Sequence, residues 1–295
     1  MEWDAEPFAA FTKPTAVTSQ GGWVELGWFG RLLFIVFMVL RALRDPREAT
    51  HIVRVPKVFL EESKREINVS LKTEGSSEWV GSFDVLMAWW LKTVYSLRRT
   101  DDTTPIHIHL PVDLREKPVF PGTSTLAAPY IHNAVLMVAV PPIPANAFRT
   151  HSLAALALRI RRAILAFNAD PDAIAAELHR RCAIPRKELF PCPPRGEYTI
   201  QSNWLKARFG ALDFSGACVG EKLQARPRVT CFIGLRANNP VRGNGVVVME
   251  DEDAVWMSQV RGVKDWENIR LSGILKVAFI RNTRPVDAHN VPGQG

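Results

Sequence analysis

Apolar residues recur with two different periods along this chain, and these periods predict strands and helices. Strict alternation over Ile106–Leu110 is typical of a strand, and it puts His107 and His109 on one face. The apolar run Ala134–Val140 predicts a second strand, which Pro141–Pro142 should end. Further strand patterns lie at Ile52–Val55, Tyr198–Ser202, Val229–Gly234, Gly245–Met249 and Ile274–Ile280.

Apolar positions three and four residues apart predict helices between these strands. The helices lie at Val58–Glu66, Ser82–Lys92, Ser152–Phe167 and Pro171–Arg181. In the second, Ser82 is expected at the N-cap, with Asp84 in the first turn to complement the helix dipole. The third should bury Leu153, Leu156, Ile160, Ile164 and Leu165 and expose Arg159, Arg161 and Arg162. Helices mixed with strands in this order indicate an α/β fold with a mixed sheet.

The apolar segment Gly21–Leu40 leaves two interpretations open. Three arginines follow it, as they would follow a membrane anchor. However, two charged residues interrupt the segment, and the uncharged run Leu32–Leu40 has about half of the roughly 20 residues that a span needs. We therefore expect a buried or docking helix, ended by Asp45–Pro46, with membrane attachment as the alternative.

Composition narrows the class of protein. The 295 residues are 47% hydrophobic and 23% charged, which is typical of a globular protein. The net charge of +7 is scattered without a long Lys/Arg run, so we expect no nucleic-acid partner. The four cysteines lack C-x-x-C spacing, which indicates neither a metal site nor a disulfide framework. The acidic start Met1–Asp4 is unlike a signal peptide, so a cytoplasmic location is expected.

Six short motifs follow one another in an order that resembles a known enzyme family. They are Ser82–Leu91, Val112–Arg115, Tyr130–Val135, Ser152–Arg161, Ser202–Trp204 with the later Asp213–Gly216, and Gly220–Lys222. This series is similar to the motifs of the acyl-CoA-dependent acyltransferases known as the BAHD superfamily. The Asp213–Gly216 turn with Gly220–Lys222 resembles the fungal branch of that family most.

The resemblance implies a chloramphenicol-acetyltransferase-like fold, a mixed sheet with flanking helices, of which this chain is mainly the second half of a two-domain enzyme. Residues 51–295 would form the acyltransferase-like domain, and residues 1–50 a remnant with the apolar helix. The implied reaction moves an acyl group, acetyl in the fungal branch, from acyl-CoA to a hydroxyl of a secondary metabolite. Acyl-CoA would be the co-substrate and a small-molecule alcohol the other partner, with no metal.

The resemblance also assigns roles to residues. Those with mainly architectural roles are Asp84, Asp113, Arg115, Trp204, Asp213, Phe214 and Gly216. For Arg115 a structural ion pair and a contact with a coenzyme A phosphate both stay open. Ser202 resembles a hydroxyl residue that the family places where it can bond the developing oxyanion. A strand-end serine that bonds its own backbone is an equal alternative.

The general base of the family is a histidine in an H-x-x-x-D motif, and residues 1–50 contain no histidine. His109 and Asp113 give a literal match elsewhere, but Asp113 already belongs to the V-D-x-R motif and His109 to a predicted strand. We interpret this match as coincidence, although His109 is the one base candidate that a motif supplies. The alternative function is a truncated non-catalytic homologue, or a subunit whose active site a second chain completes.

Overall fold

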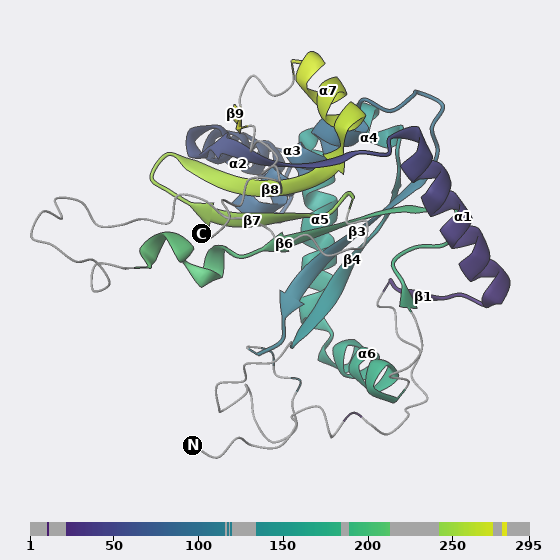
Figure 1. Ribbon diagram of the computed structural model, residues 1–295. Helices are drawn as coiled ribbons and strands as arrows, with labels where there is room; N and C mark the ends of the chain where they lie inside the picture. Colours follow the sequence, from purple (N-terminus) through teal and green to yellow (C-terminus); the bar gives the residue numbers. More distant parts are fainter. Residues whose placement is uncertain are drawn as a thin grey trace, which may run out of the picture.

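The computed structural model describes residues 11, 22–115, 117, 119, 134–183, 189–212, 242–273 and 279–281. Within them, a seven-stranded mixed sheet has the order β4-β3-β6-β7-β8-β2-β9, and a short ribbon pairs β1 with β5 (Figure 1). The strands are β1 (Val24–Glu25), β2 (Glu48–Pro56), β3 (Pro105–Asp113), β4 (Val135–Pro144), β5 (Leu189–Phe190), β6 (Glu197–Asn203), β7 (Gly245–Glu250), β8 (Ala254–Gly262) and β9 (Phe279–Arg281). The predicted α/β fold with a mixed sheet is confirmed.

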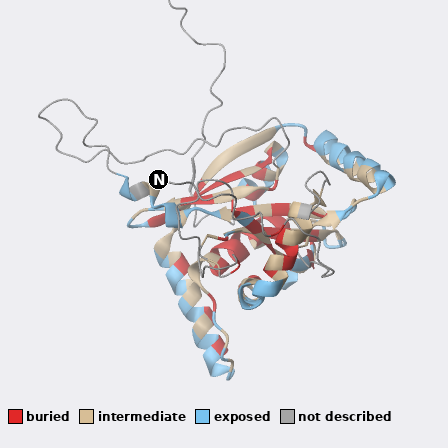
Figure 2. Ribbon diagram, turned by 90° about the horizontal axis from the view of Figure 1, so that it is seen from below, coloured by how far each residue is buried: buried red, intermediate tan, exposed pale blue. Residues whose placement is uncertain are grey.

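Helices flank this sheet, and most of them contribute buried residues to the main core. The helices are α1 (Trp28–Arg44), α2 (Lys57–Thr73), α3 (Ser82–Tyr95), α4 (Ala147–Thr150), α5 (Leu153–Ala169), α6 (Pro171–Ala183) and α7 (Val263–Leu271). Helix α3 is buried along nearly its whole length, because it is apolar on all sides and lies between the sheet and its neighbouring helices (Figure 2). Trp90 of α3 contacts Trp266 of α7, with ring centroids 5.8 Å apart.

Strand β4 continues past the proline pair, so the predicted end of this strand is wrong. Ile106 pairs with Ile143 and Ile108 with Val140, which sets Pro141–Pro142 opposite His107 alone in a β-bulge. β4 is also the last strand in the sheet order, where prolines lacking an N–H are tolerated. The bulge and the edge position together explain how two prolines fit within a strand.

The predicted start is right for α5, and the predicted cap residue is wrong for α3. Helix α5 begins where it was predicted: Ser152 is its N-cap, and the Ser152 Oγ accepts the Ala155 N–H at 3.1 Å. For α3 the predicted cap is wrong: Gly81 is the N-cap, and the Asp84 carboxylate accepts the Gly81 N–H at 2.8 Å. A Gly N-cap offers no side-chain acceptor, so only one half of a capping box is present, the bond from the N-cap N–H to the acid at the third helical position.

The prediction of which face of α5 is exposed to solvent is partly wrong. The Arg161 guanidinium lies 3.5 Å from the centroid of the Trp79 ring and 3.9 Å from the Asp84 carboxylate. Its side chain is therefore largely covered, while Leu165, expected in the core, is exposed. A cationic residue can occupy an inner position when an aromatic ring and a carboxylate both compensate it.

Helix α1 ends as predicted, with Asp45 at its C-cap, but it begins at Trp28 rather than Gly21 and is not buried. None of its residues reaches the core, and the helix carries no red at the right of Figure 2. Among the residues that the structure describes, no helix has the length and apolar character needed to cross a bilayer. The division near residue 50 stays a prediction, and β2 begins at Glu48.

Candidate active site

The sheet divides where β6 changes its neighbour. Along its first half, β6 pairs in parallel with β3, from Ile106 opposite Glu197 to His109 opposite Ile200. Along its second half, from Gln201 to Asn203, it pairs with β7 instead. Figure 1 shows β3 and β4 running away from β6 and β7 beyond this point. The end of the β3–β6 pairing is thus a fork in the sheet.

The two catalytic candidates, His109 and Ser202, lie on one face of the sheet at this fork. Paired residues of neighbouring strands share a face, so His109 and Ile200 point the same way, and Ser202 is two residues further along. With strands about 4.8 Å apart and about 3.3 Å per residue, the Cα atoms of His109 and Ser202 are roughly 8 Å apart. That spacing suits two side chains that approach one small group between them.

The environment of His109, however, is closed. The side chain is 1% exposed, and its Nε2 lies 2.7 Å from the carbonyl oxygen of Pro191. Because a carbonyl oxygen only accepts, Nε2 carries the proton and Nδ1 is the unprotonated nitrogen. Nδ1 is buried and has no hydrogen-bond partner among the described residues. The Trp23 ring lies over the imidazole, with centroids 5.4 Å apart.

The same surroundings keep this histidine neutral. Burial lowers the pKa of His109, and the positive charge of nearby Arg181 lowers it further, while the bond to the Pro191 carbonyl raises it. Burial, followed by the neighbouring His109, also lowers the pKa of His107. A neutral imidazole is the form that a general base requires, but here the lone pair on Nδ1 points into protein. The sequence pattern revealed the face of His109 but not what covers it.

Two glycines let the covering segments approach this face closely. Gly22 has φ +69°, and a Cβ there would overlap the Ala139 side chain and lie 3.5 Å from the His109 ring. At Gly196 a Cβ would lie 3.0 Å from both the His107 ring and the Cys192 side chain. The residues just before β1 and the Leu189–Gly196 segment thus seal the histidine face at short range.

Ser202 differs from His109 because it is only partly covered. It pairs with Val246 of β7, beyond the fork. Asn203, the next residue, uses its Oδ1 to accept the Leu205 N–H at 3.0 Å and so holds the turn that follows the strand. The Trp204 N–H donates to the Val247 carbonyl at 2.9 Å, which fixes the same turn to β7. Ser202 is therefore a partly exposed residue on a strand whose following turn is held by hydrogen bonds.

Polar side chains that the sequence reading missed support β6 from its other face. Gln201 and Gln259 bond each other reciprocally, at 3.3 and 3.0 Å, and Gln201 also donates to Thr199 at 2.8 Å. All three are buried. A Cβ at Gly245, on the intervening β7, would overlap the Gln259 amide. Two polar residues at alternate, inward positions of a strand were the signal available in the sequence.

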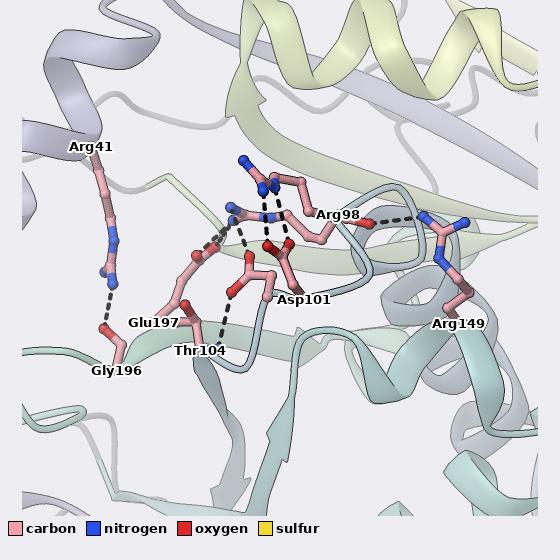
Figure 3. A network of polar contacts seen from close by, with 9 residues as sticks. Arg41, Arg98, Asp101, Thr104, Arg149, Gly196 and Glu197 are labelled. Atoms are coloured by element: carbon pink, nitrogen blue, oxygen red, sulfur yellow. Dashed lines mark hydrogen bonds and ion pairs between the residues drawn. The ribbon is translucent and has the colours of Figure 1, made fainter.

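A charged network anchors the start of β6 (Figure 3). Arg98 Nη2 donates to both carboxylate oxygens of Glu197, at 2.8 and 2.6 Å, and Arg149 Nη2 donates to the Arg98 carbonyl at 2.8 Å. From α1, Arg41 Nη2 reaches the Gly196 carbonyl at 2.8 Å. Figure 3 shows Arg41 and Arg98 reaching the start of β6 from opposite directions, with Arg149 behind Arg98. The network positions the strand that carries Ser202.

The remaining motif residues have local, architectural contacts where they are described. Arg115 bonds Asp113 through its Nη1 at 2.9 Å and its backbone N–H at 3.0 Å, so the structure has the ion pair at this motif. The Trp204 ring packs edge-on against Phe209 at 6.2 Å. Asp213, Phe214 and Gly216 lie outside the described residues. Over the described ranges, no three His, Cys, Asp or Glu side chains gather as metal ligands would.

The fold is similar to about half of two solved structures. The chain resembles the structure of F. sporotrichioides TRI101 complexed with coenzyme A and T-2 with a TM-score of 0.59 and 19% identity, over 79% of this chain and 51% of that one. For F. graminearum TRI101 complexed with ethyl coenzyme A the TM-score is 0.58, with 18% identity over 79% and 50% of the two chains. The predicted fold class is confirmed.

Sequence similarity leads to the same group of proteins. The chain is 24% identical to acetyltransferase peniE of Penicillium patulum over 269 residues, which are 84% of this chain and 55% of that protein. It is 25% identical to acetyltransferase adrJ of Penicillium rubens over 263 residues, 84% and 50% of the two. The chain therefore spans about half the length of these curated relatives. No protein-family model matches it. The resemblance to BAHD-like acyltransferases of the fungal branch is confirmed over most of the chain.

Proposed function

We propose that this chain forms one half of an acyltransferase that moves an acyl group, acetyl in the first instance, from acyl-CoA to a hydroxyl of a small secondary metabolite. The observation that carries this proposal is the similarity to two fungal acetyltransferases along 84% of the chain. The TRI101 structures with coenzyme A, T-2 or deoxynivalenol support a coenzyme A thioester and a small-molecule acceptor as substrates.

The proposed role of Ser202 is to stabilise the oxyanion. The acceptor oxygen attacks the thioester carbonyl carbon, and the carbonyl oxygen becomes negative while the acceptor's proton passes to a base. When the intermediate collapses, the carbon–sulfur bond breaks, and the proton returns to sulfur to release coenzyme A as the free thiol. A hydroxyl donor held on rigid backbone stabilises that oxyanion selectively in the transition state. Ser202 meets this requirement because its strand is fixed at both ends.

We propose further that the base lies outside the described residues of this face. His109 is neutral, but Gly22 and Trp23 close it off. Its role in this proposal is structural, and the base comes from the part of the acyltransferase fold that this chain does not span. The proposed location of this reaction is the cytoplasm.

The alternative is a non-catalytic homologue or partner subunit, and the closed environment of His109 is the observation that favours it. Free thiol released from acetyl-CoA, with a panel of terpenoid and polyketide alcohols, separates the two functions. Acceptor-dependent thiol release supports the transferase. Binding of acetyl-CoA in calorimetry without thiol release, in both the isolated chain and the completed complex, would leave the alternative.

A further inference from the structure

Helix α1 carries a continuous apolar surface on the side that faces away from the sheet. None of its residues is buried. Its large apolar side chains are exposed by 36% to 79%; they are Trp28, Phe29, Leu32, Ile35, Val36, Met38, Val39, Leu40 and Leu43. A helix that is apolar on all sides is normally an interior helix. An exposed patch of this extent indicates a contact surface.

The opposite side of α1 fixes its orientation against the rest of the protein. The Phe34 ring packs edge-on against Phe190 with centroids 4.9 Å apart, and Arg41 bonds the Gly196 carbonyl at 2.8 Å. Both contacts reach the segment that seals the histidine face. With α1 held this way, one outward stripe with helical spacing consists of Trp28, Leu32, Ile35 and Val39. We call this stripe with the neighbouring exposed residues to Leu43 the outer face of α1.

The charged residues of α1 favour a protein, rather than a lipid surface, as the binding partner of its outer face. A helix that lies in a membrane interface has a polar face rich in Lys and Arg opposite its apolar face. Before its last residue, Arg44, the charged residues of α1 are Arg31 and Arg41. Arg31 donates to the Leu26 carbonyl at 3.0 Å, and Arg41 donates to Gly196. Neither supplies a charged face for lipid headgroups, so the helix suits a protein interface with an apolar centre.

We propose that the outer face of α1 packs against the half of the acyltransferase fold that this chain does not span. The chain spans 55% of peniE, 50% of adrJ and 51% of one TRI101 chain, so each of these proteins has a further portion of similar size. In a single folded enzyme that portion has to contact the half that corresponds to this chain. The inference rests on the proposed function, since the same portion supplies the base that the sealed His109 does not.

Co-expression tests this interface. The probe is the part of acetyltransferase peniE that the similarity leaves uncovered, produced as a separate tagged chain together with the full present chain. We expect the two to purify together, and we expect Ile35→Glu or Val39→Glu to lower the affinity by about a hundredfold or more, because a charge would be buried against apolar side chains. Leu32→Gln gives a milder loss.

The matched control is Val69→Glu on α2, because Val69 is 56% exposed and Val39 is 46% exposed. This variant should leave the complex intact. All four substitutions are at exposed positions, and circular dichroism melts of each variant check that the chain stays folded. Loss of the complex with a normal melt for Val39→Glu, but not for Val69→Glu, supports the proposal.

Three results would overturn it: no complex with the peniE portion, a complex that the α1 substitutions leave unchanged, or self-association or vesicle binding of the chain that Val39→Glu removes. Sedimentation of the chain alone and flotation with phosphatidylcholine–phosphatidylserine vesicles detect the last. If the two chains form a complex but release no thiol, the interface proposal stands and the proposed transferase function is wrong. If the chain alone releases thiol, and Val39→Glu does so equally fast, the transferase function stands and the interface proposal is wrong.

Discussion

His109 donates a hydrogen bond of 2.7 Å from Nε2 to the carbonyl of Pro191, across 82 residues of sequence. This bond joins the centre of β3 to the segment that follows β5, so the imidazole holds a covering layer onto the sheet. A buried side chain with this role is structural, even though its neutral form would suit a base. The distinction between these roles is open to experiment.

Replacing His109 should therefore affect stability more than chemistry. We expect His109→Ala to lower the free energy of unfolding by about 2–3 kcal/mol, because it leaves a cavity and an unpaired carbonyl under Trp23. Urea unfolding measures this change. Turnover per folded molecule of the completed enzyme should stay within a few-fold of wild type. A loss of a hundredfold or more with unchanged stability would identify His109 as the base.

The buried His109 and the partly buried His107 should make stability depend on pH. Burial lowers the pKa values of His107 and His109 in the folded protein, while an unfolded histidine titrates near about 6.5. The unfolded chain then binds more protons below that pH, so stability is full above about pH 6.5 and falls as the pH drops below it. We expect urea midpoints to fall from pH 7.5 to 5.5, and to fall less in His107→Gln/His109→Gln. The exposed His151→Gln should keep the wild-type slope.

Gly245 should be intolerant of any side chain. A Cβ at this position would overlap the amide of Gln259, which is already bonded to Gln201 on both sides. We expect Gly245→Ala to cost about 2–4 kcal/mol of unfolding free energy in urea titrations, since buried amides must separate. In a Gln259→Ala background the added cost should shrink. Gly27→Ala, with nothing within 4 Å, is the control and should cost about 1 kcal/mol or less.

The sequence predicted the elements that have a clear local signal. Alternation identified β3 and the shared face of its histidines, and Ser152 marked the start of α5. These features depend on a few adjacent residues, and neither the period nor the cap requires knowledge of the rest of the chain.

Features that depend on distant contacts were missed or wrong. Strand β4 continues through Pro141–Pro142 because β3 opposes the pair with a bulge, which no local pattern shows. The sequence did not show that Pro191 and Trp23 cover His109. The Gln201–Gln259 pair lies across β7, 58 residues apart in sequence. In each case the determining neighbour comes from elsewhere in the chain.

The most direct test of the proposed function is transfer of a labelled acetyl group from acetyl-CoA to an alcohol by the chain with its complementary half, followed by mass spectrometry of the acceptor. The account predicts a labelled ester, with kcat about a hundredfold or more lower in Ser202→Ala, largely restored in Ser202→Thr, and with stability unchanged in both. No labelled ester, or an ester formed equally fast by Ser202→Ala, would contradict it.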